Sequence, residues 1–189
     1  MGRASWVAAV GALAAIVLGA TDQAAFARQA ESGSVDGSGG VKRPVASRSR
    51  VRTGNEILAT LIREGSERSQ TFRALLVAID ATDGLVYLTV GRCGRLRACF
   101  LHQMAVAGPN RVLNIVVNVQ DDDPRFIAPI AHELQHVLEI LGDPGITTEA
   151  GITAFYRFHG IEQKGVIETR AAIATGDAVR AEVRRSLRR

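Results

Sequence analysis

The segment from Asp123 to Gly142 constrains the fold more than any other part of the chain, because it specifies one long helix with two different faces. Asp123 can cap the start of this helix, Pro124 suits its first turn and Gly142 can end it. Pro129 has no N–H for the helical ladder, so it predicts a kink or a late start. One apolar stripe recurs at helical spacing: Ile127, Ile130, Leu134, Val137, Leu138 and Leu141. Such a helix must pack this stripe against a core.

His132, Glu133 and His136 follow the order H-E-x-x-H, and the two histidines fall almost opposite the centre of the stripe. Side chains at positions i and i+4 share one face of a helix, so both imidazoles can reach the same cation. Glu133 points to the side, where a carboxylate can act as a general base on a zinc-bound water. The pattern predicts a Zn²⁺ site with both histidines as ligands and Glu133 as a catalytic residue.

Zinc in a catalytic site takes a third protein ligand and leaves its fourth position to water. The longer motif of metzincins, with a glycine and a histidine after the second ligand, is absent because those positions hold Glu139 and Gly142. The segment "VIETRAAIATGD" offers Glu168 at the start of a helix that we expect from about 166 to 187. Glu168 is therefore the favoured third ligand.

Other donors stay open for the third position. Glu149 is the main alternative, although a carboxylate there also suits the first turn of the next helix, which Thr147 or Thr148 can cap. Glu139 and Asp143 lie near the histidine face, but a ligand from the same straight helix seldom completes a tetrahedron. His159 is a further candidate.

A hydrolase also needs a donor for the developing oxyanion, and the segment "FYRFHG" supplies the nearest ones. Tyr156 is the residue that we assign to this role, with His159 and Arg157 as alternatives. Tyr156 could equally pack in the core beside Phe155. His102 lies in a predicted strand, and we assign it no function.

These residues resemble the gluzincin branch of the H-E-x-x-H metallopeptidases, many of which present the third ligand as E-x-x-A on a later helix, as at Glu168 and Ala171. The chain is also similar to a group of uncharacterised secreted bacterial proteins with "AHELQH", "YR..G" and "ET..A" elements. The resemblance implies a zincin-like fold and hydrolysis of peptide bonds. Position 172 is Ala, where related families often place a carboxylate that orients a ligand histidine.

The N-terminus is typical of an exported protein. An apolar run from Trp6 to Ala20 follows Arg3, and Ala25-Phe26-Ala27 is a small-x-small cleavage pattern. We predict a signal peptide over 1–27, with cleavage after Ala20 or an uncleaved membrane anchor as alternatives. A Gly- and Ser-rich stretch over 28–52 predicts a disordered linker, so the folded domain is expected over 53–189.

Cys93 and Cys99 form an even pair with short spacing. In an oxidising compartment such a pair more often forms a disulfide than a metal half-site, and two unpaired thiols would require a cytosolic location. We therefore predict a Cys93–Cys99 disulfide in a secreted or periplasmic protein without a stable membrane anchor after cleavage.

The remaining patterns predict an α+β fold. Asn55 and Ser69 can each cap an amphipathic helix, and three β-branched and aromatic runs follow: "LVYLTV", "ACFLHQMAVAG" and "RVLNIVVNVQ". A turn at 108–110 joins the last two runs as a hairpin. We expect a small, mostly antiparallel sheet with an active-site helix and flanking helices, in which either run of the hairpin could pair with an extended substrate.

The net charge of +4 raises the question of an anionic partner. No aromatic stacking platform accompanies the arginines, so we expect no nucleic acid. The expected partner is a peptide or protein substrate. Two competing classes are a non-catalytic zinc-binding or interaction domain, and a basic protein that binds anionic surfaces through its C-terminal tail.

Overall fold

The computed structural model describes residues 49–163 and 166–189. The predicted signal peptide over 1–27 and the linker up to residue 48 lie outside these residues. Val51 and Arg52, which we had assigned to the linker, instead form strand β1 (Val51–Arg52), and Val51 is buried. The fold therefore starts before residue 53.

Two helices begin at the predicted caps. Helix α1 (Glu56–Arg68) starts after Asn55, whose side chain accepts a hydrogen bond from the N–H of Leu58. Helix α2 (Gln70–Asp80) starts after Ser69, whose hydroxyl accepts from the N–H of Phe72. Both caps satisfy N–H groups that a helix leaves free in its first turn, which is why these positions were readable from sequence.

The main sheet has the strand order β1-β2-β4-β3, with β2 (Gly84–Val90), β3 (Ala98–Ala107) and β4 (Asn110–Val117). The predicted hairpin is confirmed, because β3 and β4 pair antiparallel across a turn in which Gly108 has a φ of 59°. The expectation of a mostly antiparallel sheet is wrong: β1 pairs parallel with β2, and β2 pairs parallel with β4. The physical reason is that α1 and α2 form a crossover between β1 and β2, and a crossover returns the chain in the same direction.

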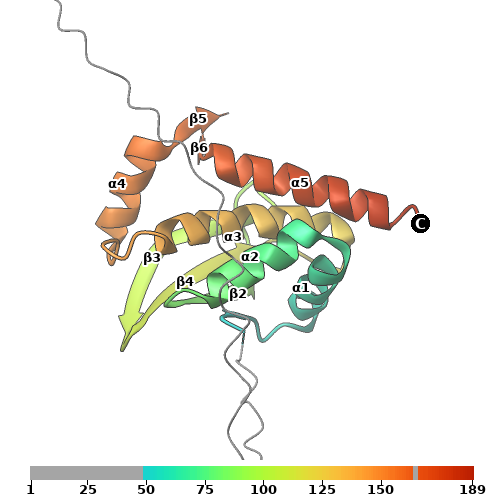
Figure 1. Ribbon diagram of the computed structural model, residues 1–189, viewed down its shortest axis with the longest axis horizontal. Helices are drawn as coiled ribbons and strands as arrows, with labels where there is room; N and C mark the ends of the chain where they lie inside the picture. The colour runs from blue at the N-terminus through green and yellow to red at the C-terminus, as the bar shows by residue number, and fades with distance from the viewer. Residues whose placement is uncertain (1–48, 164–165) are drawn as a thin grey trace, which may run out of the picture. The chain divides into compact units, whose positions relative to one another are not determined.

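Helix α3 (Ile127–Leu141) carries the H-E-x-x-H motif and follows a short 3₁₀ helix, η1 (Pro124–Phe126), which Asp123 caps. Pro129 is the third residue of α3, where the helix has no internal acceptor for an N–H, so the predicted late start is confirmed. Figure 1 shows α3 running across the sheet, with contacts to β3 and β4 on one side and to α5 (Arg170–Ser186) on the other. The two histidines are thus held in a packed layer.

The region after α3 differs from expectation. Helix α4 (Glu149–His159) starts at the predicted cap Thr148 and contacts β3. The segment that follows forms a small antiparallel pair of strands, β5 (Ile161–Gln163) and β6 (Val166–Glu168), instead of the start of the last helix. Helix α5 begins only at Arg170, with Thr169 as its N-cap. Within the described part of the chain, no helix is both long and apolar enough to cross a bilayer.

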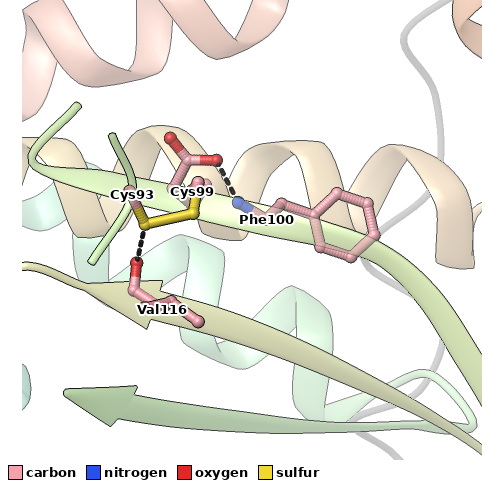
Figure 2. The surroundings of a disulfide bond; sticks show 5 residues. Cys93, Cys99, Phe100 and Val116 are labelled. Carbon is pink, nitrogen blue, oxygen red and sulfur yellow. Dashed lines mark hydrogen bonds between the residues drawn. A yellow bond between two sulfur atoms is a disulfide. The ribbon is translucent and has the colours of Figure 1, made fainter. Parts of the chain in front are cut away.

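The Cys93–Cys99 disulfide is confirmed. Figure 2 shows that it ties the loop after β2 to the start of β3, with the sulfur of Cys93 lying 3.2 Å from the carbonyl oxygen of Val116 on β4. The bridge therefore fixes the entry of β3, the strand that lies beside the motif.

Candidate metal centre

Three side chains converge at the middle of α3. Nε2 of His132 lies 2.7 Å from Oε2 of Glu168, and Nε2 of His136 lies 3.1 Å from the same oxygen. One ligand atom from each of these residues lies within 4.8 Å of the other two, so the group could hold a metal ion. The structure thus brings the predicted pair and the favoured third residue together, although they are far apart in the chain.

Glu168 reaches the histidines from a strand and not from a helix. It is the last residue of β6, and Thr169 next to it caps α5, which packs along α3. Our assignment of Glu168 to a helix start was wrong by two residues. The pairing of β6 with β5 fixes the backbone that directs the carboxylate of Glu168.

The convergence of two imidazoles on one carboxylate shifts the pKa values at the site. Burial by itself would lower the pKa of His136, but its hydrogen bonds with Glu139 and Glu168 raise that pKa from 6.5 to about 9. Burial would raise the pKa of Glu168, but the hydrogen bonds from His132 and His136 lower it to about 2. A carboxylate that stays ionised at neutral pH is ready to bind a cation.

Glu139 holds the second ring nitrogen of His136. Its Oε2 lies 3.4 Å from Nδ1 of His136, while its Oε1 accepts a hydrogen bond of 2.7 Å from the hydroxyl of Thr169. A carboxylate in this position orients the ring and directs Nε2 toward the ligand cluster. Sequence analysis considered Glu139 only as a ligand. Its spacing of three residues from His136, on one helical face, was the signal for this orienting role.

Glu133 lies beside the cluster and is tied to the sheet. Its Oε2 accepts a hydrogen bond of 2.8 Å from the N–H of Phe100 on β3. Burial raises the pKa of Glu133, against the opposing effect of the two histidines. A cavity of about 290 Å³ adjoins Glu133, His136 and Glu168. This carboxylate therefore faces a space in which a small reactant could lie.

Tyr156 closes the cavity from α4. Its ring is buried, and its hydroxyl has no hydrogen-bond partner among the described residues. Burial raises the pKa of this hydroxyl, so it stays protonated and can donate. Tyr156 therefore belongs to the hydrophobic core and also lines the cavity, so both interpretations of this residue apply.

His102 is a site residue that sequence analysis missed. It lies in a bulge of β3, where the register with β4 shifts between Leu101 and Met104. Its ring stacks on Tyr156 with centroids 4.8 Å apart, and it lines the same cavity as Glu133. Bulges often redirect a side chain beside a functional site, but no pattern in the sequence of β3 predicts this bulge.

The other predicted donors lie elsewhere. Glu149 is exposed in the first turn of α4 and is not part of the metal-binding group. His159 packs against Phe155, and neither His159 nor Arg157 lines the cavity. The carboxylate of Asp143 accepts from the N–H of Gly145 in the loop after α3. Of the candidate third ligands in the described structure, Glu168 alone forms a group with both histidines, while Glu139 contacts only Nδ1 of His136.

The residues of this group could hold a metal ion. The donor set of two imidazole nitrogens and one carboxylate oxygen is of the kind that zinc takes in catalytic sites, where the fourth position is open. The buried hydroxyl of Tyr156 is a polar atom at the site that has no hydrogen-bond partner among the described residues.

Neither a family model, nor a curated protein, nor a solved structure matches this chain. The case for a function therefore depends on the geometry of the site.

Proposed function

We propose that this protein is a zinc-dependent metallopeptidase, with His132, His136 and Glu168 as metal ligands and Glu133 as the catalytic residue. The observation that carries the proposal is the placement of Glu133 on the cavity wall beside a group of three donors, and not four, among the residues described. A purely structural zinc site is closed by a fourth protein ligand, whereas a catalytic site keeps one position open.

Glu133 supplies the proton chemistry. Zinc, when bound, would activate water and polarise the substrate carbonyl as a Lewis acid. Glu133 accepts the proton of the attacking water through its carboxylate and later delivers it to the leaving amine. The raised pKa that burial gives this carboxylate makes it a better base than a free glutamate, and the hydrogen bond from Phe100 holds its orientation.

Strand β3 is where an extended substrate can pair. Sequence analysis left two strands open for this role, but β4 is interior and β3 has β4 as its only neighbour among the described strands. Residues Cys99, Phe100 and His102 of β3 line the same cavity as Glu133. A peptide laid along this edge would place its backbone beside the base, which favours a peptide or protein as the substrate.

Tyr156 is the donor that we assign to the developing oxyanion, because its side chain lines the cavity and its hydroxyl has no hydrogen-bond partner among the described residues. His102 stacks on its ring and holds it in place. The disulfide suits an exported enzyme, so a secreted or periplasmic location belongs to the same proposal.

The proposal is tested by metal analysis and hydrolysis on matched glutamate variants. Glu133→Gln should keep one zinc per chain and lose at least about 100-fold in hydrolysis of a quenched-fluorescent peptide library, because the general base is gone. Glu168→Gln should lower zinc affinity, and Glu149→Gln, which removes an equivalent but exposed carboxylate, should change neither property.

Two results would contradict the proposal in different ways. If the purified protein and the His132→Ala variant both fail to take up zinc, there is no metal centre. If zinc binds with high affinity and the wild-type protein cleaves no peptide in the library, the competing class of a non-catalytic zinc-binding domain is correct.

A further inference from the structure

A second cavity, of about 390 Å³, lies where the start of α3 meets the C-terminal half of α5. Its lining includes four arginines: Arg97, Arg125, Arg180 and Arg184. Between them lie apolar side chains, among them Pro129, Val183 and Leu187. A hollow with an apolar floor and a cationic rim suits a ligand that carries both an anionic and an apolar group.

The positive charge of this basic cavity is only partly neutralised. Arg125 pairs with Asp123, and Arg180 pairs with Asp177 at 2.6 Å. Across residues 49–163 and 166–189, no salt bridge involves Arg97 or Arg184. Arg97 lies 5.5 Å from the ring centre of Phe126, and its charge also acts on Asp123, which lines the same cavity. Neither Arg97 nor Arg184 is held in a salt bridge within the described residues, so both can contact a carboxylate.

The basic cavity and the cavity beside Glu133 are lined by consecutive residues of the segment that leads into β3. Leu96 lines the cavity of the metal centre, and the next residue, Arg97, lines the basic cavity. Both belong to the loop that the disulfide closes, immediately before β3 begins at Ala98. On α3, Pro129 lies about one turn before Glu133. An extended chain advances about 3.3 Å per residue, so a peptide at Glu133 would reach the arginines within a few residues.

We propose that the basic cavity binds an acidic segment of the peptide substrate, with a carboxylate on Arg97 and Arg184 and a neighbouring apolar side chain on the floor. The inference rests on the proposed peptidase function for the identity of its ligand. The occupant is a peptide and not a lipid surface, because Arg97 directly follows Leu96 of the cavity beside Glu133, and both precede β3, the strand along which we propose that the substrate lies. The selected substrates are therefore acidic next to the cleaved bond.

The test measures binding, so that it depends on neither zinc nor hydrolysis. Two fluorescein-labelled peptides are titrated with the Glu133→Gln protein in fluorescence anisotropy: one alternates Glu and Leu, and the other alternates Gln and Leu. Arg97→Gln/Arg184→Gln should weaken binding of the Glu peptide about tenfold, because two partly exposed ion pairs are lost. The matched control, Arg63→Gln/Arg73→Gln, removes the same charge from exposed sites on α1 and α2 and should change binding less than about twofold. The affinity for the Gln peptide should change with neither pair of substitutions.

Equal binding of the Glu peptide by the two double variants would overturn the inference. If the first double variant unfolds in a thermal melt, Arg184→Gln alone serves, with an expected loss of about threefold and no loss for Arg63→Gln. Vesicles of phosphatidylcholine and phosphatidylglycerol provide the alternative ligand. Vesicle binding that requires Arg97 and Arg184, with peptide binding that does not, would assign the cavity to lipid. The peptidase proposal is tested by other measurements, and its failure would appear as a lack of zinc binding or a lack of peptide hydrolysis.

Discussion

Helix α3 bears two clusters of charge, and they are built in opposite ways. At its C-terminal end, the buried guanidinium of Arg111 donates to the carbonyls of Ile140, Leu141, Asp143 and Ile146 and to the carboxylate of Asp83. Every nitrogen of this side chain has an acceptor. In the middle of the helix, by contrast, two imidazoles share one oxygen of Glu168, and the hydroxyl of Tyr156 has no partner in the described structure.

From this difference we infer that the first cluster stabilises the fold and that the second binds a ligand. Arg111 caps the last carbonyls of α3 and holds the loop that leads to α4, so its hydrogen bonds are complete within the fold. The metal centre places several donors at one point with an open cavity beside them. Every nitrogen of the Arg111 guanidinium has an acceptor, whereas the hydroxyl of Tyr156 has no partner among the described residues.

The largest expected effect comes from removing the structural cluster. Arg111→Leu should lower the free energy of unfolding by about 3–5 kcal/mol, because it leaves several buried carbonyls without a donor. His132→Ala should lower it by about 1 kcal/mol or less in metal-free protein, since that side chain is partly exposed. Urea denaturation of both variants in the presence of a chelator measures the two values. If His132→Ala lowered the free energy of unfolding by the same amount as Arg111→Leu, the two clusters would contribute equally to stability and the distinction would be wrong.

A smaller effect is expected from the residue that orients His136. Glu139→Gln should weaken zinc binding about 10- to 100-fold, because the ring of His136 loses its charged acceptor while all three ligands stay. Competition with a chromogenic chelator measures the affinity, and Glu139→Asp should recover part of it. Glu149→Gln is the matched control and should bind zinc like the wild type. Unchanged affinity in Glu139→Gln would show that this carboxylate has only a packing role.

The smallest effect on stability is expected from Asp83, the exposed carboxylate that pairs with Arg111. The hydrogen bond and charge of Arg111 lower the pKa of Asp83 below 3.8 in the folded protein. This ion pair therefore stabilises the fold above pH 3.8 and loses its effect as the pH falls through the lowered pKa. The carboxylate is 43% exposed, so Asp83→Asn should cost less than about 1 kcal/mol at pH 7.

Urea midpoints of the wild type and Asp83→Asn at pH 7 and pH 3 test this dependence. The difference between the two proteins should shrink at pH 3. A difference that stays constant between the two pH values would mean that the charge of Asp83 does not contribute.

Local signals explain which parts of the fold were predictable. The caps Asn55, Ser69 and Thr148 accept from N–H groups three residues away, so sequence alone located two helix starts and placed the third at Thr147 or Thr148. The sequence predicts a helix over Val166–Glu168 because three residues are too few to show the period of a strand, and the partner strand β5 belongs to a separate segment. The parallel pairing of β2 with β4 depends on how β3 folds outside β4, which no local pattern records.

The sequence by itself determined the two histidines, the glutamate between them and the disulfide, since each depends on residue type at short spacing. Tertiary structure decided that Glu168, and not Glu149, meets the histidines, because the strand pair β5–β6 directs one carboxylate inward while α4 leaves the other in solvent. It also placed the carboxylate of Glu139 beside Nδ1 of His136. A bulge in β3 lets the ring of His102 stack on the ring of Tyr156. Contacts between distant segments depend on packing, and packing is a property of the whole chain.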